Sequence, residues 1–231
     1  MQRTIKSNID DVRRRIEDAA RRCGRDPSEI TLIAVSKLHS AEEVDAAAEC
    51  GITDFAENKV QELCSKMPLV KADARWHLIG HLQTNKVKNV IDRVCMIHSV
   101  DSRHLAEEIN KRAAQAGKVM DILLQVNAAG EESKFGLALQ DAKMLAKDVL
   151  QLENVNIRGL MEIAPYAEDP EEVRIWFRQV RQLFEELKAD GLPWLDTLSM
   201  GMSHDFETAI EEGATCIRVG TAIFGERDYT K

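Results

Sequence analysis

A lysine that directly follows a short apolar run is the most reactive feature of this sequence. Lys37 comes after the run 32–35, and no carboxylate stands beside it in the sequence. Strand alternation would place its side chain on the same face as Val35. Burial there would lower the pKa of the ammonium, and the neutral amine could condense with an aldehyde. A snorkelling or salt-bridged lysine at a strand end is the plainer interpretation of one lysine alone, so the position needs support.

Small and hydroxyl-bearing residues follow two later apolar runs and supply that support. Such residues let a phosphate approach backbone N–H groups, although most glycines serve only turns. Arg218 precedes Gly220 by two residues, so both should point into the same space. A buried arginine needs a partner, which could be an anion, a ring nitrogen or a carboxylate such as Asp121 or Glu162. The residues of this predicted anion site are Ser199, Gly201, Gly220, Thr221 and Gly225.

Metal and disulfide chemistry are not indicated. His77 and His81 have a spacing typical of metal ligands on a helix, but the segment WHLIGH reads as a strand entering a loop. No third ligand follows at a usual spacing, so we expect no metal. The 5 cysteines are odd in number and form no CxxC motif, which indicates reduced thiols.

The elements that must position these residues alternate between strand and helix. Eight βα units imply parallel strands, and eight parallel strands can close into a barrel. An open doubly wound sheet shows the same alternation, but no G-x-G-x-x-G follows a strand. We therefore predict a single-domain (β/α)8 TIM barrel over residues 1–231, preceded by an amphipathic N-terminal helix within 5–20. The predicted strands are 31–35, 53–56, 76–79, 94–97, 121–126, 157–161, 195–198 and 215–219, and the predicted helices include 41–50, 59–70, 104–116, 139–150 and 170–187.

Composition limits the partners. The chain has 231 residues, 44% of them hydrophobic, and a net charge of −8. This charge argues against a sequence-independent grip on nucleic acid or on an anionic membrane. No apolar run reaches the ~18 residues of a membrane span, and no signal peptide is apparent, so we expect a cytoplasmic protein.

Seven blocks occur in the order found in one family, and the whole chain resembles the pyridoxal-phosphate homeostasis protein family, itself similar to the barrel domain of bacterial alanine racemases. The resemblance implies that Lys37 forms an aldimine with pyridoxal 5′-phosphate (PLP). It also implies that Asn58 lies near the cofactor ring, that Arg218 faces the pyridine nitrogen, and that Lys134 matches a loop lysine discussed as a secondary acceptor. The implied phosphate site is Ser199, Gly201, Gly220 and Thr221. The blocks are AVSK (34–37), FAENKVQE (55–62), WHLIGHLQTNK (76–86), QVNAAGEESKFG (125–136), RGLM (158–161), LSMGMSHDFETAI (198–210) and GTAIFGERDY (220–229).

The predicted chemistry is binding rather than catalysis. An arginine cannot give up a proton to the ring nitrogen, so Arg218 would stabilise carbanions weakly. Racemases with this arginine add a tyrosine from a second, all-β domain, and we expect no such domain here. The tyrosines are Tyr166 and Tyr229. We predict a non-catalytic protein, favoured as a monomer, that buffers PLP or delivers it to apo-enzymes. The alternatives are a small PLP-dependent racemase or lyase and, last, a sugar-phosphate enzyme using Glu57 and Glu162.

Overall fold

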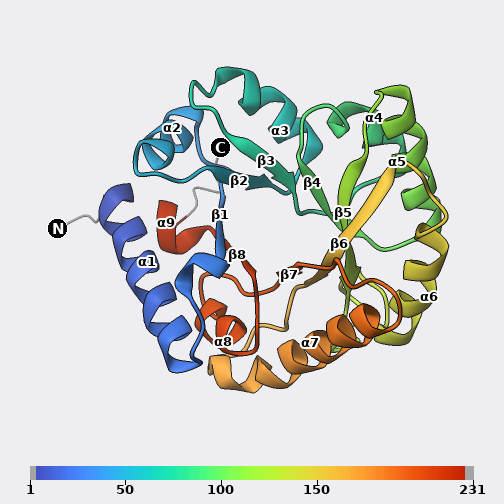
Figure 1. The fold of residues 1–231 in the computed structure, drawn as a ribbon. Helices are drawn as coiled ribbons and strands as arrows, with labels where there is room; N and C mark the ends of the chain where they lie inside the picture. Colours follow the sequence, from blue (N-terminus) through green and yellow to red (C-terminus); the bar gives the residue numbers. More distant parts are fainter. Residues whose placement is uncertain (1–3, 227–231) are drawn as a thin grey trace.

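Eight parallel strands close into a barrel in the computed structural model, which describes residues 4–226 (Figure 1). Each strand pairs with the next one along the chain, and β8 returns to pair with β1, with Arg218 opposite Ile33. The predicted (β/α)8 barrel is therefore confirmed. The strands are β1 (Thr31–Val35), β2 (Asp54–Glu57), β3 (Arg75–Leu78), β4 (Met96–Val100), β5 (Met120–Val126), β6 (Val155–Glu162), β7 (Thr197–Ser199) and β8 (Cys216–Val219).

Helices occupy the connections between the strands and form the outer layer (Figure 1). The predicted segment 59–70 is divided, because Pro68 has no amide proton to donate to a continuing α-helix; it becomes α3 followed by the 3₁₀ turn Met67–Leu69. The short helices α4, α8 and α9 were not anticipated. The α-helices are α1 (Ile5–Arg22), α2 (Ala41–Glu49), α3 (Val60–Lys66), α4 (Val87–Val90), α5 (Arg103–Gln115), α6 (Leu139–Val149), α7 (Arg174–Ala189), α8 (Phe206–Glu211) and α9 (Thr221–Phe224).

The predicted capping residues Asp169 and Pro170 start a 3₁₀ turn (Pro170–Val173), and α7 itself begins at Arg174 without a side-chain cap. The Asp169 carboxylate accepts a hydrogen bond from the Glu171 N–H, and Pro170 is the first residue of a 3₁₀ turn that leads into the helix. The helix ends at Ala189, and Gly191 then adopts a φ of 114°, which favours glycine. The predicted stop at Gly191 is confirmed.

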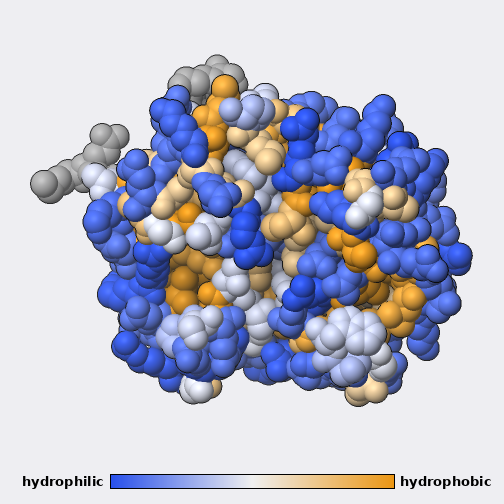
Figure 2. Space-filling view, turned by 45° about the horizontal axis from the view of Figure 1, so that its top comes forward, coloured by the Kyte–Doolittle hydropathy of each residue, from blue (hydrophilic) through white to orange (hydrophobic). Residues whose placement is uncertain are grey.

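The N-terminal helix α1 completes the helical layer. It packs against α2, α8 and α9 through a buried face that includes Ile9, Val12 and Ile16 (Figure 1). Its Arg15 makes a two-pronged contact with Glu207 of α8, at 3.2 and 2.6 Å. None of the helices in the described part of the chain is both long and apolar enough to cross a bilayer. Figure 2 shows polar residues over much of one face, with apolar residues in separate patches.

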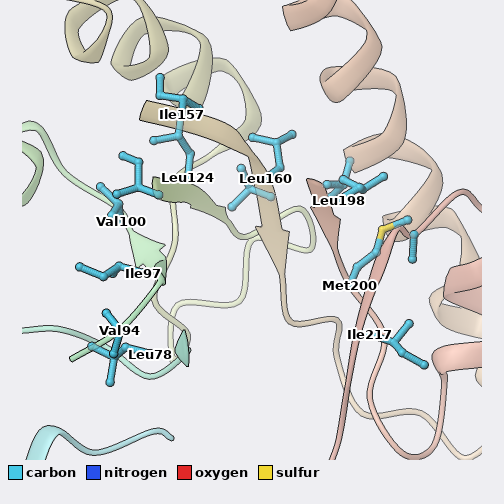
Figure 3. Close-up of a cluster of buried hydrophobic side chains, with 14 of the residues drawn as sticks. Leu78, Val94, Ile97, Val100, Leu124, Ile157, Leu160, Leu198, Met200 and Ile217 are labelled. Atoms are coloured by element: carbon cyan, nitrogen blue, oxygen red, sulfur yellow. The ribbon is translucent and has the colours of Figure 1, made fainter. Parts of the chain in front are cut away.

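The main hydrophobic core lies between the barrel and its helices. Side chains on the outer faces of the strands, such as Ile97, Leu124 and Leu198, are fully buried there (Figure 3). The barrel interior has a separate apolar cluster: Ile33, Val35, Ala56, Ile79 and Cys216. The rest of the interior includes buried polar side chains, and these lead to the candidate site.

Candidate functional site

Lys37 lies just beyond the end of β1. The ladder continues to Ser36, whose N–H donates to the Ala56 carbonyl, and Lys37 follows in a turn with a half-buried side chain. Leu38 then has a φ of +66°, in the left-handed region that non-glycine residues rarely adopt. Lys37 is therefore held by a turn rather than by the strand alternation that the sequence suggested. It still lies at the C-terminal end of the barrel, where barrel enzymes place their chemistry.

Asn58 occupies the corresponding place after the neighbouring strand β2. Its Oδ1 atom is buried and has no hydrogen-bond partner among the described residues. The loop after β3 crosses it closely, because a Cβ atom at Gly80 would lie 2.1 Å from the Asn58 carbonyl oxygen. A buried oxygen without a donor costs about 1–3 kcal/mol. A ligand group that donates a hydrogen bond to Asn58 would remove this cost.

Ser203, which the sequence analysis did not single out, contacts the loop after β8 that was predicted to bind an anion. Its Oγ atom accepts hydrogen bonds from the N–H groups of Gly220 and Ala222, each at 3.2 Å. Gly220 immediately precedes α9, and Thr221 is the exposed first residue of that helix. The hydroxyl proton of Ser203 remains available to a further acceptor, so these groups together suit a phosphate.

Gly201 lies where the loop after β7 packs closely against α8. Its φ is +93°, and a Cβ atom there would lie 2.6 Å from the Cβ atom of Ala209. Its carbonyl oxygen accepts a hydrogen bond from the Arg218 N–H at 3.0 Å. The absence of a side chain thus lets the loop after β7 pack against α8 and β8. Gly225 also has a positive φ, of 90°, but a Cβ atom there would meet nothing within 4 Å.

Arg218 is buried inside the barrel, with only 3% of its surface exposed. Its two terminal nitrogens donate to the Ser199 hydroxyl at 2.6 Å and to the backbone carbonyl of Glu162 at 2.7 Å. Neither carboxylate considered from the sequence is hydrogen-bonded to Arg218, because Asp121 pairs with Arg158 at 3.0 Å and Glu162 offers its backbone carbonyl instead. Burial lowers the pKa of Arg218. The hydrogen-bond partners of the guanidinium are therefore both uncharged. Ser199 contacts Arg218 and is not among the residues that hydrogen-bond to Ser203.

Ser199 is also part of a buried chain of hydrogen bonds across the barrel. Its Oγ lies 3.1 Å from Nδ1 of His98, Nε2 of His98 lies 3.0 Å from Nδ1 of His77, and Nε2 of His77 lies 3.0 Å from Asp54. Burial holds the pKa of His98 well below its usual range, so this imidazole is neutral. A neutral imidazole donates from one nitrogen and accepts at the other.

The direction of these bonds depends on His77. When His77 is neutral, donors run without a break from Arg218 through Ser199, His98 and His77 to Asp54. When His77 is protonated, it donates to His98, which must then carry its own proton on Nδ1, toward Ser199. Burial lowers the pKa of His77, but its bonds to Asp54 and Cys95 raise it overall. The contact between His77 and His98 was not predicted, because His98 falls just beyond the predicted strand 94–97 although it lies within β4, next to the strand of His77.

The other singled-out histidine and the candidate acid–base groups have structural contacts. His81 stacks on Phe135 with 3.8 Å between ring centroids, and among residues 4–226 no group of three or more His, Cys, Asp or Glu could hold a metal. Glu162 accepts a hydrogen bond from the Ala128 N–H at 3.2 Å, and Glu57 is bound by Lys66 at 2.6 Å. Each carboxylate also has one buried oxygen, Oε2 of Glu57 and Oε1 of Glu162, with no hydrogen-bond partner among the described residues.

Lys134 and Tyr166 line a hollow beside the barrel mouth, with a volume of about 470 Å³. The Lys134 ammonium donates to the Ala164 carbonyl at 3.0 Å and pairs with Glu131 at 2.8 Å. Tyr166 is 82% exposed and stacks on His204, 5.5 Å between centroids. The other tyrosine, Tyr229, and the end of the block 220–229 lie outside the described residues.

The loops that carry the candidate residues are neighbours. Strands β7, β8, β1 and β2 are consecutive around the barrel, so the groups that follow them meet at one end. The His39 ring, in the turn after Lys37, stacks on Phe224 of α9 with 4.8 Å between centroids. An amine, an unpartnered amide oxygen, the Ser203 hydroxyl and a buried guanidinium thus lie around one mouth. This set suits an aromatic aldehyde that carries a phosphate.

Comparisons with known proteins agree with this interpretation. The family model for the alanine racemase N-terminal domain matches residues 7–228. A pyridoxal phosphate homeostasis protein of Aquifex aeolicus is 47% identical over 219 residues, covering 94% of this chain and 96% of that protein. A protein of the same name from Pseudomonas aeruginosa is 41% identical, covering 98% and 97%.

Solved structures show the same architecture. PipY of Synechococcus elongatus, solved with PLP bound, superimposes with a TM-score of 0.81 at 39% identity and covers 91% of this chain and 100% of that one. A protein from Bifidobacterium adolescentis gives a TM-score of 0.89 at 36% identity, covering 95% and 94%. An alanine racemase of Clostridium difficile shares the fold at 13% identity and a TM-score of 0.78, and the match covers 98% of this chain but 58% of the racemase.

Proposed function

Because this chain belongs to the pyridoxal phosphate homeostasis protein family and matches the family model for the alanine racemase N-terminal domain, we propose that it binds PLP and buffers or delivers it inside the cell. Lys37 would hold the cofactor as an aldimine, so the reactive aldehyde would be bound covalently but reversibly. The observation that carries the proposal is the meeting of Lys37, Asn58, Ser203 and Arg218 at the ends of four consecutive strands.

Each group has a distinct task in this proposal. Asn58 would accept a hydrogen bond at its buried Oδ1 and so fix the orientation of the ring. The phosphate would accept a hydrogen bond from the Ser203 hydroxyl, whose oxygen is held in place by the N–H groups of Gly220 and Ala222. Thr221 adds a second hydroxyl at the start of α9. Ser199 and Gly201 would act indirectly, because both hold Arg218 in place.

Arg218 favours storage over catalysis. PLP acts as a strong electron sink when its ring nitrogen is protonated, and a guanidinium cannot supply that proton. The hydrogen bonds of Arg218 go to a hydroxyl and a backbone carbonyl, and the carboxylates of Glu162 and Asp205 affect it only through their charge. We therefore propose that the protein is not an enzyme in its main role.

The first experiment is the visible absorption spectrum of the purified protein with PLP, before and after borohydride reduction, followed by peptide mapping. We expect a yellow band that is lost on reduction, with the pyridoxyl group on Lys37. The variant Lys37→Ala should lose the band, whereas Lys71→Ala, which changes an exposed loop lysine, should keep it. A protein that stays colourless with added PLP would refute the proposal.

Delivery is tested separately from binding. Holo-protein is mixed with an apo-enzyme that requires PLP, and the enzyme's recovered activity is compared with recovery from an equal amount of free PLP in the presence of an aldehyde scavenger. Direct delivery predicts recovery that saturates with holo-protein and survives the scavenger. A holo-protein that neither releases PLP nor protects against excess aldehyde would contradict the homeostasis role.

The alternative is a small PLP-dependent racemase or lyase. The observation that favours it is Tyr166, whose exposed ring stands on His204 beside the mouth and could supply a second base. Exchange of the α-proton of amino acids with deuterated solvent tests this activity. Exchange that requires both Lys37 and Tyr166 would establish the alternative, and no exchange above free PLP would exclude it for the amino acids tested.

A further inference from the structure

A buried cluster of charges lies directly behind the turn that carries Lys37. Lys66, the last residue of α3, is 7% exposed, and its ammonium contacts Glu57 at 2.6 Å and Glu62 at 2.9 Å. Glu57 is fully buried at the end of β2 and also accepts a hydrogen bond from the Ser36 hydroxyl at 2.7 Å. These three charged side chains come from β2 and α3. All of them hydrogen-bond to the segment 36–38, which follows β1.

Two of these side chains bind the backbone on either side of Lys37. The Lys66 ammonium donates to the carbonyl oxygen of Ser36 at 2.6 Å. The Glu62 carboxylate accepts a hydrogen bond from the N–H of Leu38 at 2.5 Å. The peptide groups immediately before and after Lys37 are thus both fixed by one ion pair.

The energetics argue against a purely stabilising role for this cluster. Buried ion pairs often contribute no more than well-packed apolar residues of similar volume, because removing charges from water is costly. Glu57 also has one oxygen, Oε2, that is buried without a hydrogen-bond partner among the described residues. In addition, the φ of +66° at Leu38 costs about 1–2 kcal/mol for a residue with a Cβ atom. Strain of this kind persists where the surroundings enforce it.

We propose that Lys66 and Glu62 are positioning residues that set the direction in which Lys37 leaves β1, and thereby the rate and affinity with which it takes up PLP. This inference rests on the proposed function. Attack on an aldehyde requires the amine to lie within about 3–3.5 Å of the carbonyl carbon with the correct alignment. A lysine has four rotatable side-chain bonds, so the direction of its backbone determines which positions the amine can reach.

We call the contacts of Lys66 with the Ser36 carbonyl and of Glu62 with the Leu38 N–H the clamp. Removing the clamp should loosen the turn. In Lys66→Met the Ser36 carbonyl loses its buried donor, and in Glu62→Ala the Leu38 N–H loses its acceptor. Leu38 is then free to return to an ordinary negative φ, which would turn the Lys37 side chain away from the mouth. Glu62→Gln retains an oxygen that can accept from the Leu38 N–H, so it should restore most of the wild-type behaviour.

The first readout needs no cofactor. Hydrogen exchange of the Leu38 amide, measured by NMR, should be at least tenfold faster in Glu62→Ala and Lys66→Met than in the wild type, and close to the wild type in Glu62→Gln. The exposed Lys71 provides the matched control Lys71→Met, in which exchange at Leu38 should not change. Unchanged exchange in Glu62→Ala would overturn the clamp, whether or not the protein binds PLP.

The second readout is the rate at which the PLP absorption band develops. We expect a rate at least tenfold lower in Glu62→Ala and Lys66→Met, with Glu62→Gln and Lys71→Met near the wild type. Faster amide exchange with an unchanged rate would overturn the positioning role. If the wild type itself fails to take up PLP, the proposed function fails instead, and the amide exchange alone decides whether the clamp exists. If Lys66→Met does not fold, the two Glu62 variants decide both readouts.

Discussion

Replacing Glu162 by glutamine should stabilise this protein at alkaline pH. Burial raises the pKa of this carboxyl to about 7, although the Ala128 N–H and the positive charges of Arg218 and Lys134 oppose the change. The ordinary value is 4.5, and each pH unit is worth about 1.4 kcal/mol. Ionised Glu162 therefore costs the folded state about 3 kcal/mol once the pH is above 7.

The sign of the effect fixes its pH window. Below pH 4.5 the carboxyl is protonated in both the folded and the unfolded chain, so the wild type and the Glu162→Gln variant should be equally stable. Between pH 4.5 and 7 the folded chain keeps a proton that the unfolded chain has released, so the wild type loses stability as the pH rises. Glutamine does not titrate, and its amide oxygen can still accept from the Ala128 N–H.

Urea denaturation of the wild type and of Glu162→Gln at several pH values measures this difference. We expect the variant to be more stable by about 3 kcal/mol at pH 8, and the two proteins to converge as the pH approaches 4.5. The control Glu153→Gln changes an exposed carboxylate and should show no such trend. A stability difference for Glu162→Gln that does not grow with pH would refute the argument.

Three other predictions concern the site. Gly201→Ala should lower the free energy of unfolding by about 3 kcal/mol, because a positive φ and a 2.6 Å contact act together; Gly117→Ala, with a φ of +66° and open space, should cost about 1 kcal/mol in the same urea assay. Nitrogen-15 NMR of the imidazoles should show His77 and His98 both protonated on Nε2 at high pH, and His98 switching to Nδ1 as His77 gains its proton; a His98 tautomer that stays constant would contradict the hydrogen-bond chain. Ser203→Ala should weaken PLP binding at least ~10-fold in a spectroscopic titration but leave pyridoxal, which lacks the phosphate, unaffected.

The architecture was largely readable in the sequence because it depends on local patterns. Alternating apolar runs and amphipathic stretches of the right number predicted eight βα units, and the barrel has them in that order. Strand ends were less certain: the predicted strand 94–97 is Met96–Val100 in the structure. Pairing with neighbouring strands decides where a strand ends, and this is not a local property.

The candidate site was predicted unevenly. Lys37 and Arg218 were singled out because reactive residue types at strand ends can be recognised from the sequence, whereas Asn58 was predicted only through the family resemblance. The contacts of Ser203 with Gly220 and Ala222 were not predicted, because they depend on where α9 begins and nothing in the sequence marked that short helix.

What the sequence determined by itself was the barrel, the lysine that follows its first strand and the family resemblance, because each depends on residue order. Only the tertiary structure decided the partners of the buried charges. Arg218 reaches a hydroxyl on β7 and a carbonyl on β6, and Lys66 reaches back 30 residues to the Ser36 carbonyl. A buried charge must be satisfied by whatever polar groups the closed barrel brings within hydrogen-bonding distance, and that distance is set by packing rather than by separation along the chain.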